Sequence, residues 1–79
     1  MKVDAVRNLV ENYTIDQLVE AEKALVNGED LSFRVVGEDA SEKLTYLLAA
    51  VYILERLKSG TLEFAEAFRQ YTLQVRETF

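Results

Sequence analysis

The chain has 79 residues, 49% of them hydrophobic and 29% charged, with a formal net charge of −5 and neither cysteine nor histidine. This composition is typical of one small folded domain rather than of a disordered chain. The missing residue types exclude disulfides, zinc sites built on thiolate or imidazole, and the nucleophilic pairs that use Cys or His. We therefore predict a single domain over residues 1–79 that is not an enzyme and holds no cofactor and no metal.

The acidic balance also limits the partners that we expect. An acidic surface repels phosphate backbones and anionic lipid. The longest apolar run, residues 46–54, is far shorter than the roughly 20 residues that cross a bilayer. The start of the chain does not have the pattern of a signal peptide. We expect no membrane contact, no nucleic acid and a cytoplasmic location, which suits a chain without cysteine.

Apolar residues at helical spacing predict two short helices, over residues 3–12 and 15–27. The segment Thr14-Ile15-Asp16-Gln17 matches a capping box, in which Thr14 and Gln17 satisfy each other's backbone amides at a helix start. Asn27 and Gly28 supply the left-handed residue that commonly ends a helix.

Glu22 lies within the apolar stripe of the second helix. A carboxylate in that position must reach solvent or be paired, because an unpaired buried charge is costly. Arg7, Arg34 and Arg56 are the candidate partners for a buried ion pair. Such a carboxylate can alternatively mark a ligand pocket.

Residues 31–36 alternate apolar and polar side chains, are rich in β-branched and aromatic types, and lie between Gly28 and Gly37. This pattern predicts one short strand. A lone strand leaves its backbone groups unpaired, so the segment either pairs with a symmetry copy of itself or serves as an extended linker.

A third helix is predicted over residues 41–59, capped by Asp39 or Ser41, and a fourth over 61–78 after Gly60. The apolar run in the third helix is too broad for one helix face. We therefore expect a small, mainly α-helical bundle that forms a homodimer or higher oligomer through this helix. The candidate interface residues are Tyr46, Leu47, Leu48, Val51 and Tyr52 of the third helix, Leu62 and Leu73 of the fourth, and Phe33 and Val35 of the strand.

The order strand, helix, Gly-containing turn and helix over residues 31–79 resembles the ribbon-helix-helix family of dimeric DNA-binding proteins. That resemblance implies a two-chain ribbon whose outward residues read the major groove. The matching positions are Ser32, Arg34 and Val36, of which Arg34 alone is basic. Acidic residues flank this ribbon where phosphates would lie.

Taken whole, the chain resembles the short bacterial domains of unknown function. The segments that carry this resemblance are Thr14-Ile15-Asp16-Gln17-Leu18 and Gly37-Glu38-Asp39, the latter followed by the apolar run to Leu54. The resemblance implies no activity. From the residues we predict a non-catalytic protein–protein interaction or regulatory module that acts as a homo-oligomer. Its expected partners are a second copy of itself and, as an alternative, another protein. A ribbon-helix-helix-like DNA-binding regulator and a small-ligand-binding domain are the alternatives.

Overall fold

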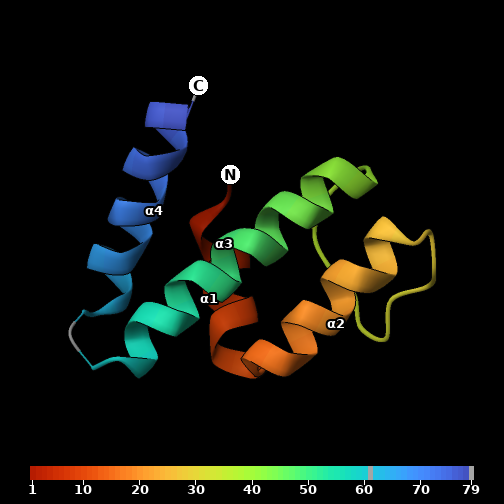
Figure 1. Cartoon of the computed structure of the whole chain (residues 1–79), viewed down its shortest axis with the longest axis horizontal. Helices are drawn as coiled ribbons and strands as arrows, with labels where there is room; N and C mark the ends of the chain where they lie inside the picture. The colour runs from red at the N-terminus through yellow and green to blue at the C-terminus, as the bar shows by residue number, and fades with distance from the viewer. Residues whose placement is uncertain (61, 79) are drawn as a thin grey trace.

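The computed structural model describes residues 1–60 and 62–78, and the side chains of these residues up to residue 75. It contains four helices: α1 (Val3–Asn12), α2 (Ile15–Val26), α3 (Ala40–Lys58) and α4 (Phe64–Thr78). Helix α3, the longest, crosses the middle of the molecule, and α1, α2 and α4 each pack against it (Figure 1). The mainly α-helical bundle predicted from the sequence is confirmed.

The central position of α3 explains its broad apolar run. Leu47, Ala50 and Ile53 are fully buried, because other helices of the same chain cover α3 from several sides. Leu48 is the exception in this run, with 46% of its surface exposed. Most of the apolar run is therefore buried without a second chain. Only the uncovered part of α3, around Leu48, is available for contact with another copy.

Local hydrogen bonds fix where α2 and α3 begin. The predicted capping box is confirmed: Thr14 Oγ1 accepts the Gln17 amide at 3.2 Å, and Gln17 Oε1 accepts the Thr14 amide at 2.9 Å. The Asp39 carboxylate caps α3 by accepting the Glu42 amide at 2.9 Å. The Glu42 carboxylate in turn accepts the Glu38 amide at 2.8 Å. Each bond satisfies an amide that lacks a partner within the helix.

The helix ends differ slightly from the predicted bounds. Helices α2 and α3 match the predicted ranges to within one residue at each end, whereas α4 begins at Phe64 rather than at 61. Thr61 lies outside the described residues. Leu62 is half-buried against the core before α4 begins, so it belongs to the connection and not to the helix. Gly28 has a φ angle of +73°, which confirms the left-handed helix end predicted there, and Gly60 after α3 has the same conformation, with a φ angle of +77°.

The predicted strand at 31–36 is wrong: no residue in the described part of the chain forms a strand. Every second side chain instead anchors an irregular loop to the helices. Val35 is buried, Leu31 packs on the core, and the Phe33 ring stacks on Tyr13 with the centroids 4.0 Å apart. Within the described chain, the backbone amides of residues 30–37 donate no hydrogen bond. The structure therefore has no strand at residues 31–36, where the ribbon-helix-helix resemblance implies one.

Among the described residues, no helix is both long enough and apolar enough to cross a membrane.

Candidate interaction surface

A shallow groove of about 350 Å³ runs between α2 and α3. Glu22 and Val26 form one wall, and Leu44 and Leu48 form the other, because residues four apart share a helix face. Val26 is 72% exposed although it is an apolar residue at the end of α2. We call this site the α2–α3 groove; its lining residues are Glu22, Lys23, Val26, Asn27, Leu44 and Leu48.

The groove contains a carboxylate that the chain does not neutralise. Glu22 Oε1 is buried and accepts no hydrogen bond from the described residues. Burial raises the pKa of Glu22, and the negative charge of Glu55 raises it further. Among the side chains that the structure describes, the one ion pair joins Lys23 to Glu20 at the surface, at 3.5 Å, and does not include Glu22. The groove is therefore suited to a positive charge supplied from outside it.

None of the three arginines considered as partners pairs with Glu22. The Arg7 guanidinium lies 4.7 Å from the centroid of the Phe64 ring, and Arg34 is exposed on the loop. The Arg56 guanidinium stacks on the Tyr52 ring at 3.8 Å. Two of these arginines are thus held by aromatic rings, an arrangement that stabilises a cation without neutralising it.

Helices α2 and α4 lie on opposite sides of α3 (Figure 1). Tyr52 marks the α4 side, because its ring meets the Tyr71 ring edge-on with the centroids 5.4 Å apart. Burial raises the pKa of the Tyr71 hydroxyl at this contact. Between the two sides α3 leaves a partly exposed strip, the α3 face, which consists of Leu44, Leu48, Val51, Tyr52, Glu55 and Arg56. On this strip Glu55 lies close enough to Glu22 of α2 for their charges to interact, and the Arg56 cation lies against the Tyr52 ring on the α4 side.

The structure separates the predicted interface residues into three groups. Tyr46, Leu47 and Val35 are buried within the chain. The Tyr46 hydroxyl accepts the Lys2 amide at 2.9 Å. The second group is half-buried and consists of Phe33, Val51, Tyr52 and Leu62. Leu48 and Leu73 are exposed, but Leu73 lies on the face of α4 opposite its buried stripe. Leu48, Val51 and Tyr52 are brought together on the α3 face, and the interface prediction included neither Leu44 of that face nor Val26 of the adjoining groove.

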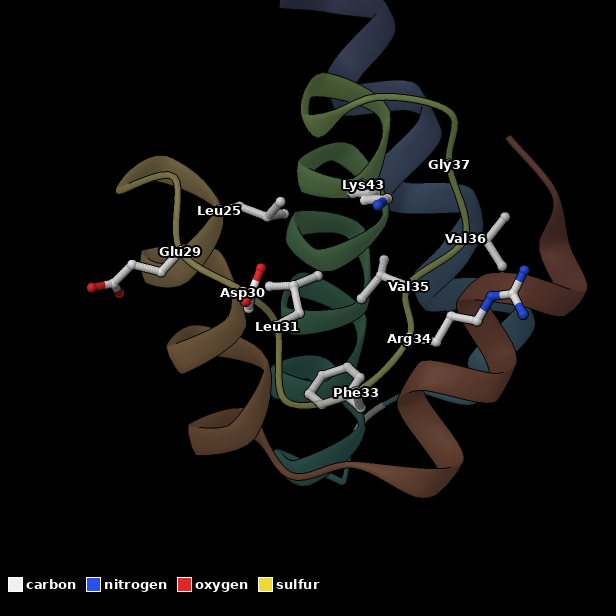
Figure 2. Close-up of a pocket in the computed structure, with 10 residues that line it drawn as sticks. All are labelled: Leu25, Glu29, Asp30, Leu31, Phe33, Arg34, Val35, Val36, Gly37 and Lys43. Carbon is white, nitrogen blue, oxygen red and sulfur yellow. The ribbon is translucent and has the colours of Figure 1, made fainter.

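A second cavity, of about 460 Å³, lies beneath the loop that joins α2 to α3. In Figure 2 the side chains of Leu31 and Val35 point inward, and Arg34 points away. Gly37 packs so closely on the start of α3 that an added Cβ would lie 2.9 Å from the backbone nitrogen of Lys43. The cavity is lined by Leu25, Glu29, Asp30, Leu31, Phe33, Arg34, Val35, Val36, Gly37 and Lys43.

Within the described residues, no group of three or more acidic side chains is arranged to hold a metal ion. No curated protein and no solved structure matches the chain. The model of one family of unknown function, DUF6952, matches residues 1–79. Since this match covers the whole chain, as the resemblance to small domains of unknown function implied, the protein belongs to the DUF6952 family.

Proposed function

We propose that this protein is a non-catalytic interaction module that acts as a homodimer, with the α3 face and the adjoining α2–α3 groove as its contact surface. The observation that carries the proposal is the exposure of Leu48 and Val26 on either side of one apolar groove. Single exposed apolar residues are ordinary, but apolar residues gathered around a groove and bordered by polar ones are typical of interaction sites.

A second copy of the chain is the simplest partner for this surface. A two-fold axis joins the same patch on both chains, so one surface serves both partners. A domain of this size gains little stability from its own core and commonly gains more from association. Pairing would remove Leu48 from water, along with the apolar parts of Val51 and Tyr52.

The experiment compares Leu48→Asp with Leu73→Asp by measuring molar mass in solution with light scattering. The two leucines are similarly exposed, at 46% and 49%, but lie on different surfaces. We expect the parent and the Leu73 variant to be dimers and the Leu48 variant to be a monomer with native helical content. A monomeric parent at high protein concentration, or a dimeric Leu48 variant, would contradict the proposal.

The cavity beneath the loop supports a second candidate function, the binding of a small polar molecule with an anionic group, because its lining combines the cations Arg34 and Lys43 with the acids Glu29 and Asp30. Lys43 is half-buried at this cavity and makes no ion pair with the described residues. Binding to the native state raises the melting temperature. A thermal-shift screen of small carboxylates and phosphates should find a stabilising compound whose effect is lost in Lys43→Gln. A screen without stabilising compounds would rule against this candidate.

A further inference from the structure

The charges on the α3 face point toward different edges of that face but lie at a similar level along the helix. Glu55 and Arg56 are neighbours in sequence, and the Arg56 guanidinium is held over Tyr52 on the α4 side. Helix α2 runs opposite to α3 (Figure 1), and Glu22 borders Leu48 closely enough to Glu55 for the two carboxylates to interact. The acidic pair and the cation are therefore separated across the face rather than along it.

This arrangement distinguishes between two ways of placing one α3 face on another. A two-fold axis across α3 would reverse one helix and place the α2 side of each chain on the α2 side of its partner. With the axis at the level of Glu22 and Glu55, carboxylates would then face carboxylates, which is repulsive. With the axis at any other level, Arg56 of each chain would still lie on the side away from its partner's carboxylates. An axis along α3 keeps the helices parallel, preserves the level of each residue, and places the α2 side of one chain on the α4 side of the other.

We infer that two chains pair with their α3 helices parallel, so that Arg56 of each copy binds Glu22 and Glu55 of the other. This inference rests on the proposed homodimer and names the contact that fixes its geometry. Every such contact occurs twice in a two-fold dimer. An arginine can offer two parallel N–H donors to a carboxylate, and its stacking on Tyr52 limits the freedom that it loses on binding.

The helical spacing places Leu48 and Tyr52 between Glu55 and Arg56 around α3, and these two side chains form the apolar centre of the contact. Their burial would exclude water from the Arg56–carboxylate contacts on both sides, which strengthens them. The buried Oε1 atom of Glu22, which has no hydrogen-bond partner within the described chain, gains a donor in this arrangement. The groove beside Leu48 provides the space through which the guanidinium reaches it.

The test is a mixing experiment with two complementary variants. One chain carries Arg56→Glu, and the other carries Glu22→Gln together with Glu55→Lys. In either homodimer like charges would meet, so each variant alone should dimerise at least roughly tenfold more weakly than the parent. In the mixed dimer, both contacts join opposite charges. We expect an equimolar mixture to form a one-to-one heterodimer, detected by native mass spectrometry.

Arg69→Glu is the matched control, because it makes the same change of charge on an exposed position of α4 and should dimerise as the parent does. If circular dichroism finds either charge-reversal variant unfolded, Arg56→Gln and Glu55→Gln replace them, each with a weaker dimer expected. A dimeric parent whose affinity is unchanged by the Arg56 variants, or a mixture that forms no heterodimer, overturns the parallel pairing but not the proposed function. A monomeric parent overturns both.

Discussion

Glu22 is the residue at which sequence and structure differ most informatively. Its place in an apolar stripe was enough to predict that its carboxylate needs a counter-ion. The spacing of four residues places Arg56 beside Tyr52 on α3, but the sequence could not indicate whether any arginine reaches Glu22 on another helix. Whether charges on different helices pair depends on tertiary packing, which spacing along the chain does not give.

Glu22→Gln should change how the stability of the monomer depends on pH. A raised pKa means that the folded chain holds this proton more strongly than the unfolded chain, so stability falls as pH rises through the raised pKa. We expect the glutamine variant to melt at a higher temperature than the parent at neutral pH. The difference should shrink as pH falls toward the ordinary carboxyl range, at about pH 4.

Melting temperatures measured by circular dichroism in dilute protein, where the monomer dominates, would check this expectation. Glu20→Gln is the control, because Glu20 is an exposed residue on the same helix. Equal pH dependence of the melting temperature in the parent and the Glu22 variant would show that folding does not raise the pKa of this carboxylate.

At the scale of elements, the helices could be predicted and the strand could not. Helices can be predicted from periodicity and from local caps such as Thr14 with Gln17, because both involve residues close in sequence. The alternation of Leu31, Phe33 and Val35 has the period of a strand, but a strand also needs a partner for its backbone. Here the inward side chains find the helices, and the same period results from a loop anchored at every second residue.

The cap of α3, which the sequence left open between two residues, gives a second prediction. The Asp39 carboxylate accepts a hydrogen bond from the Glu42 amide. Ser41 is instead a residue of the first turn of α3, and it is exposed. Asp39→Ala should lower the free energy of unfolding by about 1 kcal/mol, as for other N-caps. Ser41→Ala should have little effect. Urea unfolding of both variants decides it, and equal losses would mean that the start of α3 is misplaced.

For the whole molecule, the sequence predicted the importance of the run at 46–54 but not which of its residues are exposed. Leu47 and Leu48 are the same residue type, and the less apolar Tyr46 beside them is buried, so hydropathy does not rank the exposure of these residues. Their burial is decided by where α1, α2 and α4 cross α3, and those crossings involve contacts between distant parts of the chain. Leu47 is fully buried and its neighbour Leu48 is nearly half exposed for this reason.

These adjacent leucines give a third prediction. Leu47→Asp places a charge in the core and should destabilise the monomer by several kcal/mol, enough to unfold it. Leu48→Asp should keep the fold and lose only the dimer. Circular dichroism reports the first effect and molar mass the second. If the two variants behave alike, α3 is not divided into a covered side and an open side as described.

The loop between α2 and α3 makes the molecule divisible. Its amides from 30 to 37 donate no hydrogen bond within the described chain, and Arg34 is exposed, so brief treatment with trypsin should cut there first. The cut leaves α1 and α2 on one fragment and α3 and α4 on the other. Because α1 and α2 each pack on α3, we expect the two fragments to remain together without a peptide bond. Separately made peptides covering 1–34 and 35–79 should then reassemble when mixed, which the recovery of helical content would reveal.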